Sequence, residues 1–126
     1  MALPPAFRSS IGERCYLTYG EDGCVKLMAE ETFRQEADEL IEAAKRGEVS
    51  RARRRAFSSS VVQASLDKQG RIAIDQRLRD HAGLEPSAPV VLLGDLDHIE
   101  LWEPSRYEAQ ETIGLGELAG STGMAS

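Results

Sequence analysis

The chain has 126 residues, of which 41% are hydrophobic and 29% are charged, a composition that suits a folded globular protein rather than a disordered one. This length allows one ordinary domain or two very small units that share a core, and it excludes a large multidomain enzyme. The net charge of −6 argues against a polyanion-binding protein unless the basic residues are segregated.

The basic residues are segregated along the chain. Residues 1–50 carry a net charge of −4, residues 51–80 a net charge of +5, and residues 81–126 a net charge of −7. Any contact with a polyanion should therefore be confined to one face, supplied by the middle segment.

No part of the chain predicts export or membrane insertion. No apolar run approaches the roughly 20 residues that cross a bilayer, and the first ten residues lack the apolar core of a secretory signal. Cys15 and Cys24 form neither a CxxC pair nor a disulfide framework, which suits a reducing compartment. We therefore expect a cytoplasmic protein with no membrane partner.

The chain contains an internal repeat. Residues 16–33 align without gaps on residues 90–107. Each copy predicts an apolar strand, a tight turn, an alternating strand and then a helix that starts near Ala29 or Pro104. Neither copy has enough apolar surface to be stable alone, so the two β-rich units should share a core.

The alignment extends upstream of these blocks. Residues 2–8 align on residues 73–79, and each block ends in an arginine. Residues 57–72 predict a further strand, a turn and a return strand that starts at Arg71. Because Met1 aligns with Ile72, we expect the matching strand and turn of the first copy to precede residue 1.

Between the copies, apolar residues recur at helical spacing over residues 30–46, and Gly47 is a plausible helix stop. Residues 51–57 predict a second, short helix with outward-facing arginines. The division of the chain that we predict is a first unit with its helix at 1–47, a basic connecting segment at 48–57, a second unit at 58–113 and a disordered tail at 114–126.

The sequence LDKQGRIAI, followed by RLR and then VVLLGDLDHIELW, resembles the MraZ family of bacterial transcriptional regulators over residues 2–113. The most specific element is an Asp-x-x-x-Arg signature, present as Asp67 and Arg71 around Gly70. The resemblance implies an α+β, mainly β fold of two pseudo-repeated swapped-hairpin units of the SpoVT-AbrB type, with a helix after each. It also implies a nucleoid-associated regulator that forms a ring oligomer. Such a regulator would bind short direct repeats in double-stranded DNA upstream of the division and cell-wall gene cluster.

The basic residues of the middle segment are the candidates for DNA contact. A guanidinium after a glycine turn can pair bidentately with guanine or with phosphate, and a carboxylate four residues earlier can hold the turn in shape. The alternatives are an Asp–Arg pair that only closes a hairpin, and a solvated arginine-rich helix face. The candidates for DNA contact are Arg71, Lys68, Arg51, Arg53, Arg54 and Arg55, and those that shape the loop are Asp67 and Gly70.

Other function classes receive less support from the sequence. His81 and His98 belong to no metal-spaced or hydrolase motif, although a dyad of His98 with Cys15 or Cys24 stays open. We expect no enzyme activity, cofactor, metal or small-molecule substrate. The alternative function is an antitoxin-like or other protein-interaction module of the same fold.

Overall fold

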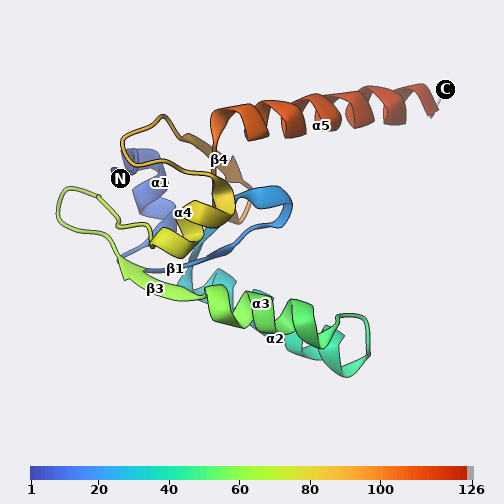
Figure 1. Ribbon diagram of the computed structural model, residues 1–126, viewed down its shortest axis with the longest axis horizontal. Coiled ribbons are helices and arrows are strands. Elements are labelled where there is room, and N and C mark those ends of the chain that lie inside the picture. The colour runs from blue at the N-terminus through green and yellow to red at the C-terminus, as the bar shows by residue number, and fades with distance from the viewer. Residues whose placement is uncertain (125–126) are drawn as a thin grey trace.

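Five antiparallel strands form a single sheet in the computed structural model, which describes the backbone of residues 1–124 and the side chains of residues 1–120 (Figure 1). The strand order across the sheet is β3-β1-β2-β5-β4. The strands are β1 (Arg14–Tyr19), β2 (Val25–Ala29), β3 (Val62–Ser65), β4 (Val91–Asp95) and β5 (His98–Trp102). The α+β class predicted from the sequence is confirmed.

Two β-hairpins supply four of these strands. β1 and β2 are joined by the short 3-10 helix η1 (Glu21–Gly23), and β4 and β5 are joined by a tight turn. The hairpins meet through β2 and β5, where Val25 lies opposite Leu101 and Leu27 lies opposite Ile99. The two alternating strand patterns of the repeat therefore end up side by side at the centre of the sheet.

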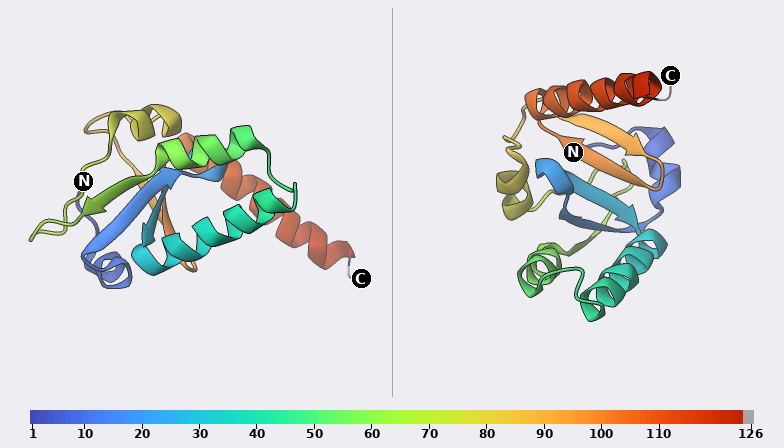
Figure 2. Two further views of the ribbon diagram at one scale, coloured as in Figure 1. Left: turned by 90° about the horizontal axis from the view of Figure 1, so that it is seen from below. Right: turned by 90° about the vertical axis from the view of Figure 1, so that its right-hand side faces the viewer.

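One face of the sheet carries the core. Alternation along β1 and β2 buries Cys15 and Leu17, then Val25 and Leu27, against the short helices α1 and α4. The bounds of these helices are Pro5–Ile11 for α1 and Gln76–Ala82 for α4, which lie at opposite ends of the sheet (Figure 2). The core is aliphatic, as expected from the low content of aromatic residues.

The opposite face of the sheet holds a helical hairpin through stacked aromatic rings. Helices α2 (Glu30–Lys45) and α3 (Arg51–Ser60) form this hairpin. The ring of Tyr16 stacks on that of Phe33, with the ring centroids 4.2 Å apart, and the ring of Phe33 stacks on that of Phe57, with the centroids 6.2 Å apart. These aromatic side chains pack the helices onto the sheet.

Both predicted helices between the copies are present. Helix α2 ends one residue short of the predicted range, whereas α3 continues three residues beyond it. In the last turn of α3, the hydroxyls of Ser59 and Ser60 donate to the carbonyls of Ala56 and Phe57. These bonds satisfy serine side chains that would otherwise compete with the helical backbone.

The two cysteines are buried. Cys15 and Cys24 are free thiols with no exposed surface, and they lie on β1 and just before β2. Burial raises the pKa of Cys15 to about 11, and burial together with the nearby Glu100 raises the pKa of Cys24 to about 12. Neither thiol is therefore ionised near neutral pH.

The C-terminal segment differs from the prediction. The segment 114–126 is predicted to be disordered, but helix α5 (Pro104–Met124) continues through residue 124 and projects away from the sheet (Figure 1). Residues 125–126 lie outside the described residues. Glu103 accepts bonds from the backbone N–H of Ser105 and Arg106 and so caps the first turn. Once nucleated, a helix gains a hydrogen bond for each added residue, which here outweighs the low helix propensity of its glycines.

A second difference concerns the return strand predicted from Arg71 onward. Only a single bridge, between Arg71 and Ala2, is present there. The backbone of Met1 and Leu3 flanks this bridge and bonds with Ile72 and Gly70. The pairing is confined to these few residues, so no regular strand forms. In the described part of the chain, no helix is long and apolar enough to cross a membrane.

The burial of Leu27 where β2 pairs with β5 predicts how strongly this residue stabilises the fold. Leu27 has no exposed surface, so Leu27→Ala should lower the free energy of unfolding by about 2–5 kcal/mol, measured by urea denaturation. The matched control is Leu96→Ala at the fully exposed tip of the β4–β5 hairpin, which should change it by less than about 0.5 kcal/mol. Equal effects of the two changes would contradict this account of the core.

Candidate nucleic-acid interface

Asp67 organises the loop that carries Arg71. Its Oδ1 accepts the backbone N–H of Gln69 at 2.8 Å and that of Arg71 at 2.9 Å, while Oδ2 accepts the Nε–H of Arg71 at 2.9 Å. The Asp67 carbonyl also accepts the N–H of Gly70 at 2.9 Å. One carboxylate therefore bonds both to the turn and to the base of the arginine side chain.

The guanidinium of Arg71 keeps binding capacity despite this bond. The side chain is 59% exposed, and in the described part of the chain its two terminal amino groups have no partner. A guanidinium presents several donors in one plane, so bonding through Nε leaves the two outer groups available for an acceptor. Closing the hairpin and contacting a ligand are therefore compatible roles for this residue.

The hydrogen bonds to Asp67 also keep it charged. The backbone N–H of Arg71, followed by its guanidinium, lowers the pKa of the Asp67 carboxyl below its ordinary value. A pKa that folding lowers gives stabilisation that is present above the ordinary pKa and is lost as the pH falls through the lowered value. The loop should therefore keep this geometry throughout the neutral range.

Because Gly70 has no side chain, the guanidinium of a second arginine, Arg8, can lie directly against the loop. The φ of Gly70 is +74°, and a Cβ at this position would collide with the guanidinium of Arg8. The Nε–H of Arg8 donates to the carbonyl of Leu3 at 2.7 Å, while the N–H of Leu3 donates to the carbonyl of Gly70 at 2.9 Å. Arg8 is thus an anchor of the loop that sequence reasoning did not identify as a site residue. Its alignment with Arg79 was the available signal.

Helix α3 divides its arginines between two faces. Ser50 caps the helix by accepting the N–H of Arg53 at 3.1 Å. A shallow groove at the helix surface is lined by Arg51, Arg54, Arg55, Ser58 and Ser59. Arg53 lies elsewhere, because its guanidinium pairs with Glu21 on η1 at 3.2 Å. Three of the four arginines share one surface, which we call the α3 basic face (Arg51, Arg54 and Arg55), and Arg53 does not belong to it.

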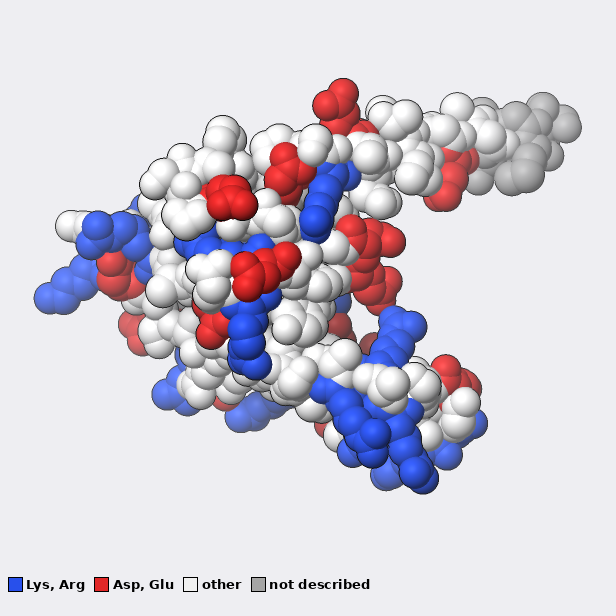
Figure 3. All heavy atoms as spheres, viewed as in Figure 1, with Lys and Arg blue, Asp and Glu red and all other residues white. Residues whose placement is uncertain are grey.

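The loop and the α3 basic face form two separate positive regions. Strand β3 lies between them and spans about 13 Å at the usual rise per residue. Figure 3 shows basic side chains gathered over the α2–α3 hairpin, others at the opposite end of the molecule, and further ones between them. Lys68 is exposed at the loop. The structure therefore brings Lys68 next to Arg71 but does not bring the α3 arginines into the same patch.

Two further arginines of the basic segment contact residues close to them in sequence. The guanidinium of Arg77 lies 3.5 Å from Asp75, the residue that caps α4. Arg79 donates its Nε–H to the carbonyl of Ile74 at 3.1 Å. Arg79 is therefore a structural residue, in the same way as Arg8.

The bonds made by Asp67 predict its effect on loop order. In Asp67→Ala the amides of Gln69 and Arg71 lose their acceptor, so their hydrogen exchange, followed by NMR, should be faster. Asp38→Ala, an exposed aspartate on α2, is the matched control and should leave both amides unchanged. Unaltered exchange in Asp67→Ala would show that the loop holds its shape without the carboxylate.

A comparison of Gly70 with Gly47 tests whether Arg8 lies as close to Gly70 as the structure shows. The φ angles of Gly70 and Gly47 are +74° and +73°, but a Cβ on Gly47 would meet nothing. Gly47→Ala should therefore cost about 1 kcal/mol of stability, the strain of the backbone alone, and Gly70→Ala should cost more. The stability losses are measured by thermal unfolding. When Gly70→Ala is combined with Arg8→Ala, the additional loss at Gly70 should become smaller, because the clashing guanidinium is gone. An equal cost for both glycines would contradict the close contact.

Comparison with known proteins assigns the chain to a family. A family model described as "MraZ protein, putative antitoxin-like" matches residues 58–113. A protein named "Transcriptional regulator MraZ" from Lachnoclostridium phytofermentans is 34% identical over 117 residues, which cover 93% of this chain and 81% of that relative. A protein of the same name from Bifidobacterium longum is 34% identical, and the match covers 94% of this chain and 80% of that relative. Another, from Mycoplasmopsis synoviae, is 35% identical, and the match covers 86% of this chain and 76% of that relative. Identity at this level over most of both chains shows that this protein belongs to the MraZ family.

Proposed function

We propose that this protein is a sequence-specific DNA-binding transcriptional regulator. The observation that carries the proposal is the loop in which Asp67 holds Arg71 by its Nε and leaves its terminal amino groups available. The names of the relatives, transcriptional regulators, point in the same direction. On this proposal the chain acts by binding and not by catalysis.

The two positive regions would have different roles. Arg71 is suited to base readout, because two parallel N–H groups match the O6 and N7 acceptors of guanine in the major groove. Lys68 and the α3 basic face would contact phosphates, which position the protein but carry no sequence information directly. Arg53 stands apart from these contacts, because it is turned toward Glu21, which accepts from one of its terminal amino groups at 3.2 Å, and so does not lie on the α3 basic face.

We also propose that the fold consists of two pseudo-repeated swapped-hairpin units, at 1–47 and 58–113. In support, α1 and α4 both have seven residues and end at a glycine with positive φ. Arg8 and Arg79 each donate Nε–H to a carbonyl five residues earlier. The register of β2 against β5 is symmetric about the pair Lys26 and Glu100, as a two-fold relation between the hairpins requires.

One copy of the chain offers few DNA contacts. A ring oligomer that engages several short direct repeats would combine weak sites into strong binding, because each further contact becomes intramolecular. On this proposal the ring binds repeats upstream of the division and cell-wall gene cluster, in the cytoplasm and at the nucleoid.

The test is a fluorescence-anisotropy titration with labelled DNA from upstream of the protein's own operon. The wild type should bind it saturably, in preference to a shuffled sequence, and more weakly by about tenfold or more between 50 and 200 mM salt. Arg71→Ala should lose about 1–3 kcal/mol of binding free energy and part of its sequence preference. Arg34→Ala, an exposed arginine on α2, is the matched control and should bind as the wild type does.

The same titration tests the α3 basic face, for which we expect a different effect. Replacing Arg51, Arg54 and Arg55 by alanine should weaken binding to all sequences alike and reduce the salt dependence. Selective binding that Arg71→Ala leaves unchanged would move base readout away from the loop. Absence of saturable binding by a folded chain would overturn the proposal.

A second candidate function is an antitoxin-like interaction module, which the description of the matching family model favours. Such a protein would be encoded beside a toxin gene and would form a stable complex with that toxin. Co-expression with the product of an adjacent gene, followed by size-exclusion chromatography, distinguishes this function from DNA binding alone.

A further inference from the structure

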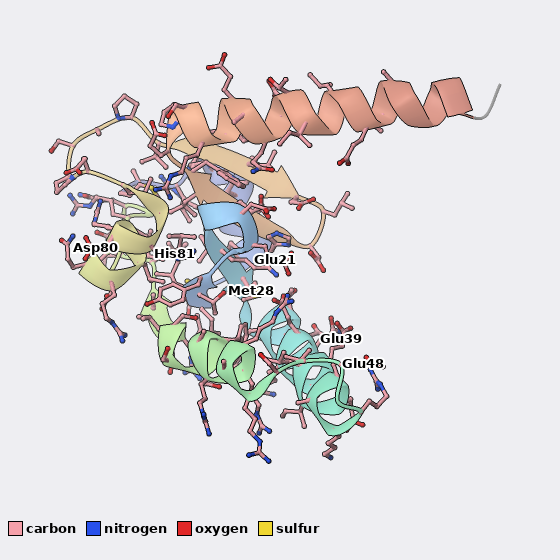
Figure 4. The ribbon with its side chains drawn as sticks, turned by 45° about the vertical axis from the view of Figure 1, so that its right-hand side comes forward. Glu21, Met28, Glu39, Glu48, Asp80 and His81 are labelled. Carbon is pink, nitrogen blue, oxygen red and sulfur yellow. The ribbon has the colours of Figure 1, made fainter. Side chains whose placement is uncertain are left out.

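An acidic groove of about 450 Å³ lies between the central sheet and the start of α5. Five carboxylate side chains line it, contributed by η1, β4, β5 and α5: Glu21, Asp22, Asp95, Glu100 and Glu111. Figure 4 shows Glu21 on η1, at the space between α5 and the α2–α3 hairpin. The one lysine or arginine in its lining is Lys26, which pairs with Glu36 at 2.6 Å. The groove therefore has an excess of negative charge.

His98 sits among carboxylates on one side of this groove. Its Nε2 lies 2.9 Å from Oε2 of Glu100 and 3.5 Å from Oδ2 of Asp95. Donor atoms of these three side chains all lie within 4.8 Å of one another. Ligands held at about 2.1 Å from a shared ion are about 3.0 Å apart at octahedral angles and about 3.4 Å apart at tetrahedral ones. The 2.9 Å between Nε2 and Glu100 is the length of a hydrogen bond and also close to the octahedral spacing, and the 3.5 Å between Nε2 and Asp95 is close to the tetrahedral one.

Neighbouring side chains hold the three groups in this arrangement. Nδ1 of His98 bonds to Oδ1 of Asp97 at 2.8 Å, which directs the opposite nitrogen, Nε2, at the other two carboxylates. The indole N–H of Trp102 donates to Oε1 of Glu100 at 3.0 Å and leaves Oε2 facing the imidazole. A carboxylate behind a histidine and a donor behind a carboxylate are the supports that metal ligands usually have.

The carboxylates of this cluster outnumber the positive charge that His98 can supply. Among the described residues, no lysine or arginine forms an ion pair with Asp95, Asp97 or Glu100, whose ion pairs all involve His98. The side chains of His98 and Glu100 are only 12% and 17% exposed. Three carboxylates face one imidazole, so the cluster keeps an excess of negative charge even when His98 is protonated, and this excess favours a further positive ligand.

We propose that Asp95, His98 and Glu100 bind a first-row divalent metal ion, Zn²⁺ or Mn²⁺, at the base of the β4–β5 hairpin turn. One imidazole nitrogen and two carboxylate oxygens suit these ions, whereas soft ions require thiolates. Cys24 is no competitor, because its buried thiol donates to the carbonyl of Glu21. The open side of the groove leaves room for water molecules to complete the coordination. The ion would join both strands of the hairpin across its turn.

The test is isothermal titration calorimetry of the tag-free full-length chain with ZnCl₂ and, separately, with MnCl₂. At least one ion should bind with one-to-one stoichiometry and raise the melting temperature in proportion to its occupancy. His98→Gln and Glu100→Gln should abolish this binding, and Asp97→Asn should weaken it about tenfold or more. Glu108→Gln, an exposed glutamate on α5 outside the groove, is the matched control and should bind as the wild type does.

Two outcomes of this experiment would overturn the proposal. Absence of binding for both ions would overturn the proposal and leave the hydrogen bonds of His98 to Asp97 and Glu100 as what holds the cluster together. Binding that persists unchanged in His98→Gln would place the ion elsewhere. If circular dichroism shows His98→Gln to be unfolded, Asp95→Asn provides the same test at a more exposed ligand, with a loss of about tenfold or more expected. DNA binding is measured separately, so either proposal can fail without the other.

Discussion

The fold depends on the antiparallel pairing of β2 with β5. This contact joins two hairpins, neither of which is stable alone as two strands in water, into one five-stranded sheet. The paired residues Val25, Leu27, Ile99 and Leu101 are all nearly or completely buried. They form the apolar centre on which α1 and α4 pack. The loop is attached to this centre through β3, which pairs with β1, and residues of both hairpins line the acidic groove.

Patterns confined to neighbouring residues predicted most of the fold. The alternation within each hairpin, the apolar spacing along α2 and the turn chemistry of Asp67 and Gly70 depend on contacts that are short in sequence, so the residue types alone are informative. The order of the strands and the pairing of the two hairpins join segments far apart in the chain, and the sequence patterns did not predict them. The class of the fold and its family membership follow from these same segments.

Long-range contacts explain what the sequence did not predict. Glu21 is 32 residues from Arg53 and removes it from the basic surface, although the spacing of the arginines gave no sign of this. The approach of Arg8 to Gly70 joins the N-terminal segment to the loop, so a residue far from the signature supports it. The grouping of Asp95, His98 and Glu100 depends on how one hairpin turn folds, and their spacing matches no familiar metal motif. The helix through residues 114–124 reflects nucleation at Glu103 rather than local propensity.

The burial of both cysteines gives the protein a built-in reporter of its own opening. Cys15 and Cys24 have no exposed surface and stay protonated, so an alkylating reagent reaches them only when the sheet separates. Cys15 lies on β1 and Cys24 precedes β2, so the two thiols report on the same hairpin. The rate at which they are modified therefore measures how often the first hairpin detaches from the core, without any introduced label.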